Sequence, residues 1–285
     1  MAEQIVLGLL LGGIYVAVGL GFSLVWGVLN IVNLAYGALV MVASYGTWLL
    51  SNRYDLDPFL SIPVNIVVLF ALGYAIQYAV INRIIRAPFL YTFLITFGLD
   101  LIVVNALLYL FHADFHLVRT SYSDSSLVLG PITIPYMRLL SLAVAMILAG
   151  AMWLLLNRTK TGDAIQAVGA DKDAARLVGI NLRHVYSLTF GIGAACAGVA
   201  GALIVTYQAI FPSAGEPYTL QAFVVVILGG LGRVSATIVG GLLFGLIEVL
   251  AQAVPHVGAG YANAIAFAVL VIVLLLRPQG LLGRV

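Results

Sequence analysis

The sequence predicts an all-α polytopic membrane protein with about eight or nine transmembrane helices, some of them broken or re-entrant. Of its 285 residues, 63% are hydrophobic and 8% are charged, whereas a soluble protein commonly has charge on about a quarter of its residues. The mean hydropathy is +1.13, and the apolar residues form runs near the length of about 20 residues that crosses a bilayer. We expect residues 1–285 to form a single transmembrane domain.

The apolar runs predict the crossings in chain order. The first, residues 5–27, follows an N-terminus without the positive charge of a secretory signal, so we expect a retained helix. A short piece, residues 220–230, ends in glycines and is too short for a comfortable crossing, which indicates a broken or re-entrant helix. The other predicted spans are residues 34–50, 60–82, 89–111, 137–156, 187–207, 236–253 and 261–276.

The placement of positive charge predicts how these crossings run. With residues 220–232 counted as a crossing, there are nine, and ten of the 13 cations fall in loops on one side. Loops rich in Lys and Arg face the cytoplasm, which predicts an outside N-terminus and a cytoplasmic C-terminus. The cytoplasmic cations are Arg83, Arg86, Arg158, Lys160, Lys172, Arg176, Arg183, Arg233, Arg277 and Arg284, and the other loops hold Arg53, Arg119 and Arg138.

Small residues spaced four apart predict where helices pack closely. Such spacing lets two helix backbones approach each other, and dispersion then holds them together. Most of the 30 glycines are therefore expected to serve packing. The spaced sets are Gly8 and Gly12; Gly193, Ala197 and Gly201; and Gly241 and Gly245.

The longest predicted cytoplasmic loop, residues 157–186, is charged and rich in alanine, unlike its surroundings. We expect Thr161 to cap a first short helix, and Asp171 to cap a second that runs through Leu177 and stops at Gly179. Capped helices indicate a folded knob, and its apolar residues would leave a low-relief surface for a partner. In the alternative, the knob packs back on the membrane domain or rests in the headgroup layer.

Polar side chains inside the predicted spans mark a second region. A charge near mid-bilayer costs at least about 2.5–3.5 kcal/mol, so such groups should face the bundle interior, a partner subunit or a water-filled path. Helix breaks expected at 28–37 and 228–236 would expose backbone groups that can receive a zwitterion. The candidates for a translocation path are Asn30, Asn33, Gly37, Asp100, Asn105, Gly229 and Gly230.

A structural interpretation stands beside the functional one. The asparagines can cap helix ends, and the intramembrane carboxylates can be satisfied by neighbouring backbone or hydroxyl groups. For Asp100 the two interpretations are balanced, whereas for Glu248 we favour the structural one.

The residues for catalysis are missing. The chain contains no G-x-x-x-x-G-K-[ST] phosphate loop, and neither Lys160 nor Lys172 follows a glycine-rich loop, so ATP hydrolysis is not expected. His112 and His116 have the spacing of two zinc ligands on a helix, but no third ligand is evident. The single cysteine, Cys196, offers no thiol cluster. We expect no enzyme activity, no metal, no cofactor in this chain and no nucleic acid partner.

Four stretches, in order along the chain, resemble permeases of the ATP-binding-cassette (ABC) importers of the branched-chain amino acid type, the LivH type. Residues 12–45 resemble the first two helices of that family. Residues 159–203, which include TGDAIQAVGADKDAARLVGI, resemble its cytoplasmic loop and following helix. Residues 222–250 (AFVVVILGGLGRVSATIVGGLLFGLIEVL) resemble its glycine-rich late segment, and residues 277–283 (RPQGLLG) its terminal motif.

This resemblance implies an ABC importer permease fold and a bacterial inner-membrane location. It implies a second permease subunit, identical or different, two cytoplasmic ATPase subunits that hold ATP and Mg, and an extracytoplasmic substrate-binding protein. The loop after the fifth helix would be the coupling segment that seats in the ATPase. The residues that the resemblance assigns to it are Gly162, Asp163, Ala164, Ala167, Asp171, Ala174, Ala175, Leu177, Gly179 and Ile180.

The expected substrates are leucine, isoleucine and valine, although related systems carry urea, short amides or small aromatic and carboxylic acids. A stand-alone ion-coupled secondary transporter is the alternative from another class, and Asp100 is its strongest candidate coupling group. A membrane scaffold without a transport function is the third interpretation. On the outer side, we expect residues 112–136 to form a small cap or hairpin and the turn at 211–218 to contact a docking protein.

Overall fold

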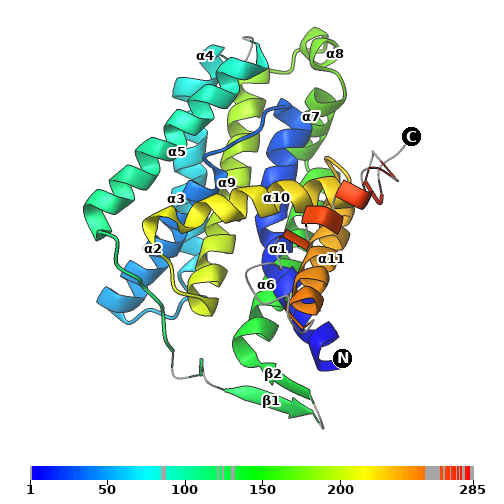
Figure 1. Ribbon diagram of the computed structural model, residues 1–285. Coiled ribbons are helices and arrows are strands. Elements are labelled where there is room, and N and C mark those ends of the chain that lie inside the picture. Colours follow the sequence, from blue (N-terminus) through cyan, green and yellow to red (C-terminus); the bar gives the residue numbers. More distant parts are fainter. Residues whose placement is uncertain are drawn as a thin grey trace.

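The computed structural model of the chain is a helical bundle with a small hairpin at one end (Figure 1). The structure describes residues 2–84, 88–120, 122–123, 125–129, 132–253, 264–265, 267–269, 271–273, 275, 277 and 280–282. Its helices are α1 (Ala2–Leu29), α2 (Tyr36–Tyr54), α3 (Ile62–Ile76), η1 (Gln77–Ile81), α4 (Asn82–Ile84), α5 (Phe89–Phe111), α6 (Tyr136–Arg158), α7 (Lys160–Ala170), α8 (Lys172–Leu177), α9 (Leu182–Tyr207), η2 (Pro212–Gly215), α10 (Glu216–Gly229) and α11 (Val234–Gln252); its strands are β1 (Ser126–Leu129) and β2 (Ile132–Pro135).

Six helices among the described residues are long and apolar enough to cross a membrane. Five of them are α1, α5, α6, α9 and α11, and the sixth runs continuously from Ile62 to Ile84 through the π-helical turn η1. The multi-pass architecture expected from the hydropathy is confirmed. Of the predicted span 261–276, residues 264–265, 267–269, 271–273 and 275 are described, and they are helical. Arg86 and Arg284 lie outside the described residues.

The short apolar piece is a short helix, as predicted. Helix α10 has 14 residues, about 21 Å at 1.5 Å per residue, which is less than the hydrocarbon thickness of about 30 Å. In Figure 1 it lies across the bundle instead of along it.

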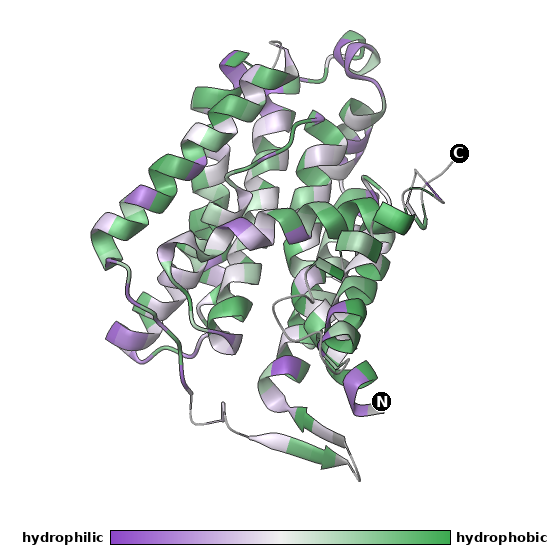
Figure 2. Cartoon of the chain, viewed as in Figure 1, coloured by the Kyte–Doolittle hydropathy of each residue, from purple (hydrophilic) through white to green (hydrophobic). Residues whose placement is uncertain are grey.

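Helices α1 and α9 form the centre of the bundle. In the most apolar 18 residues of α1 and of α9, 78% and 83% of the residues are buried, against 11% for α5. Figure 2 shows hydrophilic residues mainly at the two ends of the bundle.

The spaced glycines form helix contacts, which confirms their predicted packing role. Gly8 and Gly12 on α1 face Gly241 and Gly245 on α11. A Cβ added at Gly245 would lie 2.4 Å from the nitrogen of Gly12 and 2.7 Å from the carbonyl oxygen of Gly8. On α9, a Cβ at Gly201 would lie 2.3 Å from the carbonyl oxygen of Val40. Only hydrogen side chains allow backbones to come this close.

The end of the bundle that carries β1 and β2 has a hairpin, as expected within residues 112–136. The two strands are antiparallel, with Ser126 opposite Pro135. The chain before them is held by a backbone bridge, in which the N–H of His116 donates to Ile210 (2.9 Å) and the N–H of Ile210 donates back (2.8 Å). His112 and His116 both follow the end of α5 at Phe111, so they do not share a helix face.

The turn at 211–218, which is predicted to contact a docking protein, is partly folded into the bundle, whereas Ser213, Glu216 and Pro217 are exposed. Pro212, Ala214 and Gly215 are buried in η2. Gly215 packs directly on Gly37 at the start of α2, where an added Cβ would lie 2.0 Å from the Gly215 carbonyl oxygen. Glycine at both positions allows this close approach.

Candidate functional site

Helices α7 and α8 form a projection at the end of the bundle opposite the hairpin, in Figure 1 the upper end. We call residues 160–180 the projection. Its first helix is capped by Thr159, and not by Thr161 as predicted. The Thr159 hydroxyl accepts a hydrogen bond from the N–H of Gly162 at 3.0 Å and donates to the Leu155 carbonyl at 2.6 Å. The helix therefore begins two residues closer to α6 than predicted, and Thr159 connects the two helices.

Most of the apolar side chains of α7 pack on their own bundle. Ile165 and Val168 are 1% and 0% exposed, respectively, which corrects the expectation that they form a surface in water. Gly162 is buried as well, and an added Cβ there would lie 2.2 Å from the Leu155 carbonyl oxygen. For α7, packing against the membrane domain is the correct interpretation, and α7 fixes the base of the projection to α1, α6 and α9.

Helix α8 is the part that projects. The Asp171 carboxylate caps it as predicted, accepting hydrogen bonds from the N–H groups of Asp173 (2.9 Å) and Ala174 (3.0 Å). The predicted left-handed stop at Gly179 is also confirmed, with φ +86°. At the end of the helix, its last residue Leu177 and the C-cap Val178 are 88% and 77% exposed, so two large apolar side chains face solvent at a hydrophilic end of the molecule.

The predicted coupling residues therefore divide by exposure. Gly162 and Ala175 are buried and act within the fold, which corrects the expectation that they contact a partner. Ala164, Ala167 and Ile180 are half-buried. The exposed members are Asp163, Asp171, Ala174, Leu177 and Gly179.

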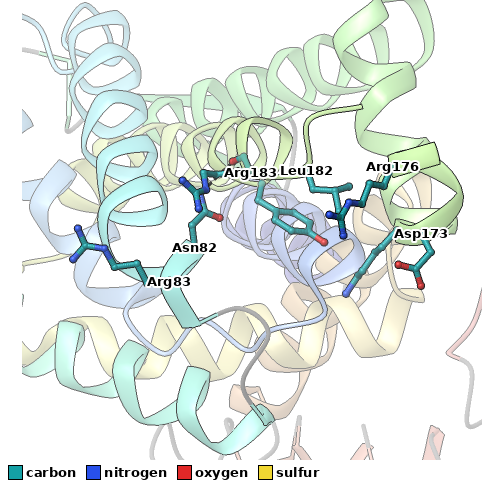
Figure 3. Close-up of a pocket in the computed structure, with 8 residues that line it drawn as sticks. Asn82, Arg83, Asp173, Arg176, Leu182 and Arg183 are labelled. Atoms are coloured by element: carbon teal, nitrogen blue, oxygen red, sulfur yellow. Dashed lines mark hydrogen bonds between the residues drawn. The ribbon is translucent and has the colours of Figure 1, made fainter. Parts of the chain in front are cut away.

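A cationic groove lies beside α8, and the sequence analysis did not single it out. It has a volume of about 710 Å³ and lies between the α4 end and the start of α9. Figure 3 shows Asn82 and Arg83 on one side of it and Asp173 and Arg176 on the other. The described residues that line it are Asn82, Arg83, Lys172, Asp173, Arg176, Leu182, Arg183 and Tyr186. Four of the cations that the sequence assigns to the cytoplasmic side therefore line one groove: Arg83, Lys172, Arg176 and Arg183.

The predicted helix breaks contact the two ends of α10. Gly37, just after the first break, donates its N–H to the Thr219 hydroxyl on α10 at 2.8 Å. At the other end of α10, Gly230 has φ +118°, and an added Cβ at Gly229 would lie 2.0 Å from the Ala236 carbonyl oxygen. Asn33 is 2% exposed, and its Oδ1 has no hydrogen-bond partner among the described residues. Asn30 is exposed with φ +56°, a left-handed conformation that asparagine tolerates.

The α5 members of the predicted path differ in their surroundings. Asp100 is half-buried and lies one turn after Thr96, whose hydroxyl donates to the Val32 carbonyl in the first break at 3.2 Å. Asn105 is exposed, and its side-chain amide donates to the Leu101 carbonyl of the same helix at 2.7 Å. The structure therefore places Gly37, Gly229 and Gly230 at the ends of α10, and it places Asp100, but not Asn105, near the first break.

The last described residues close the end of α10. The N–H of Leu281 donates to the Leu228 carbonyl at 2.9 Å, and that of Leu282 donates to the Gly229 carbonyl at 3.0 Å. These carbonyls belong to the last turn of α10 and have no partner within a helix. Leu281 and Leu282, which belong to the RPQGLLG stretch, thus stabilise the break that follows α10.

A polar cavity under α10 was also missed. It has a volume of about 340 Å³, and its walls come from α1, α9, η2, α10 and α11 and from the segment after α9. Two tyrosine contacts cross it. The Tyr15 hydroxyl donates to the Glu248 carboxylate, and the Gln208 amide donates to the Tyr218 hydroxyl. The polar lining residues come from five separate segments, with one or two in each. They give no local sequence signal, which is why the cavity is visible only in three dimensions.

A multi-pass helical bundle with a short helix lying across it, helix breaks at the two ends of that helix, and a capped projection defines the class as a membrane permease. The family model described as branched-chain amino acid transport system / permease component matches residues 4–274, and the chain belongs to this family.

Curated relatives extend over the same length. The high-affinity branched-chain amino acid transport system permease protein BraD of Pseudomonas aeruginosa is 29% identical, over 99% of this chain and 95% of its own. The corresponding permease protein LivH of Escherichia coli is 28% identical over the same shares. The permease protein LivM of Escherichia coli is 27% identical, over 94% of this chain and 68% of its own. No solved structure matches the chain.

Proposed function

We propose that this protein is the permease subunit of an ABC importer that carries branched-chain amino acids into the cytoplasm across a bacterial inner membrane. The main support is the match, over nearly the whole chain, to permease proteins named for high-affinity branched-chain amino acid transport. As a permease it provides the route, and ATP with Mg²⁺ would be held and hydrolysed by separate subunits.

The projection is the proposed site of ATPase docking. Leu177 and Val178 are exposed beyond a capped helix, and apolar side chains so placed favour a partner surface. Because α7 is anchored to α1, α6 and α9, a force applied to α8 would be transmitted to the central helices of the bundle. We assign contact to the exposed Asp163, Ala174 and Leu177 and to the outer faces of Ala164 and Ala167.

The two ends of the bundle indicate where the other proposed partners would bind. The end with the projection and the cationic groove would face the cytoplasm, since cations favour that side, and this orientation would place the N-terminus outside. The hairpin end would then meet a substrate-binding protein. A second permease subunit is supported by the relatives LivH and LivM of Escherichia coli, which are both named permease proteins of the same kind of system.

Leu177→Asp tests the docking proposal. The substitution puts a charge on a side chain that is 88% exposed, so it should leave the bundle intact. An interface anchor contributes about 2 kcal/mol or more, equivalent to roughly 30-fold in affinity. We expect ATPase subunits to be lost on co-purification, together with ATP-driven leucine uptake. Leu177→Met, which keeps an apolar side chain, is the matched control.

Unchanged co-purification of Leu177→Asp would contradict docking on α8. Ion-gradient-driven uptake by vesicles that contain this chain alone would contradict the importer proposal as a whole. Ala175→Arg is unsuitable for this test, because Ala175 is 3% exposed and an arginine there would disrupt α8 itself.

A further inference from the structure

The polar cavity under α10 has the place and size of a small-molecule site. Its volume of about 340 Å³ lies within the range of ligand pockets, about 300–1,000 Å³. Tyr15, on its wall, follows Ala2 by 13 residues and precedes Leu29 by 14. The cavity therefore lies about 20 Å from either end of α1, beside the last residues of α9 and α11, Tyr207 and Gln252.

One carboxylate dominates the charge of the cavity. Glu248 on α11 accepts hydrogen bonds from the Tyr15 hydroxyl and from the side-chain amide of Gln252, the latter at 3.3 Å. Both donors are neutral, and no Lys, Arg or His is among the described residues that line the cavity. A carboxylate at this depth is costly, and a ligand that brings a positive charge would offset that cost.

A second polar side chain lines the same cavity. Gln221 on α10 lines the cavity and is 6% exposed. Its Oε1 is buried and accepts no hydrogen bond from any residue that the structure describes. A buried acceptor without a donor is uncommon in native proteins. Glu248 and Gln221 together therefore favour a ligand with several N–H donors, and an ammonium group carries three.

The remaining walls fit the rest of an aliphatic amino acid. Leu11, Ile14 and Phe211 supply apolar surface for a short hydrocarbon side chain. Pro217 and Tyr218, in the first turn of α10, also line the cavity, so the partially positive end of that helix lies where a ligand carboxylate could be received.

We propose that this cavity holds the amino acid in transit, with Glu248 and Gln221 receiving its α-ammonium group. The inference rests on the import function proposed above and deepens it. It selects a zwitterion with an apolar side chain over urea, amides and simple carboxylic acids, which have no ammonium group to place against Glu248.

The test uses the complete importer in proteoliposomes, with both permeases, the ATPases and the binding protein. Leucine uptake and ATP hydrolysis are measured in parallel. Glu248→Gln keeps the size and an acceptor oxygen but removes the charge. We expect uptake per ATP hydrolysed to fall at least about tenfold, the factor that corresponds to 1.4 kcal/mol. Glu248→Asp should restore part of it, and Glu3→Gln, a charge-matched change in the first turn of α1, should keep parent uptake.

Parent-like uptake by Glu248→Gln, or an equal loss in Glu3→Gln, would overturn the inference while leaving the import function intact. Absence of ATP-driven leucine uptake by the parent importer would overturn the import function, and the inference with it. If Glu248→Gln does not assemble, Gln221→Leu decides, because its Oε1 makes no hydrogen bond that the fold would lose. Reduced uptake in that variant supports the site, and parent-like uptake overturns it.

Discussion

Replacing Gly245 with alanine should force α1 and α11 apart. The added Cβ would lie 2.4 Å from the Gly12 nitrogen, whereas ordinary contact begins at 3.4 Å, so the helices must separate by about 1 Å (3.4 − 2.4). The atoms it meets belong to the backbone, and no side-chain rotation relieves the clash. Overpacking of this kind costs about 1–3 kcal/mol.

The assay is thermal unfolding of the purified protein in detergent. A loss of 1 kcal/mol lowers the melting temperature by about 2–4 °C in domains of 150–250 residues, so we expect a fall of about 2–12 °C. Gly150→Ala on α6 is the matched control, because an added Cβ there meets no atom within 4 Å. Equal melting temperatures for the two variants would refute the assignment of Gly245 to a backbone contact.

Three further predictions concern the projection and the ends of α10. Asp171→Ala removes the acceptor for two N–H groups of α8 and should cost about 0.5–2 kcal/mol, seen as faster hydrogen exchange in α8 but not in α7. Gly280→Ala should detach the segment around Gly280 from α10, because Gly280 has φ +78° and an added Cβ would lie 2.4 Å from the Ile227 carbonyl oxygen. Faster proteolysis of that segment would show the detachment. Thr219→Val leaves the N–H of Gly37 without its acceptor and should cost about 1–3 kcal/mol in thermal unfolding, whereas Thr219→Ser should not.

Hydropathy was sufficient to predict most helices, because lipid requires each crossing to be an uninterrupted apolar helix. The predicted span 89–111 has the bounds of α5. Helix α9 begins earlier than its predicted span, since Asn181 caps it within a polar stretch that hydropathy does not register. The contact between Gly37 and α10 and the closure of α10 by Leu281 had no local signal, because each joins segments that are distant in the chain.

The candidate site was predictable where the signal was local. Asp171 and Gly179 carry the residue types that begin and end a helix, and both took those roles. Ile165 and Val168 were misplaced because an apolar side chain in a charged loop has the same pattern whether it faces a partner or its own bundle. Glu248 was interpreted as structural because its neighbours in the polar cavity come from four other segments.

The closure of α10 by the final stretch has a consequence for biogenesis. The donor Leu281 lies 53 residues after its acceptor Leu228 (281 − 228), so α11 and everything up to that donor must leave the ribosome before the short helix gains its last bonds. Until then its terminal carbonyls need water or another temporary partner. The route through the bundle would thus be completed late, after the surrounding helices are already in the bilayer.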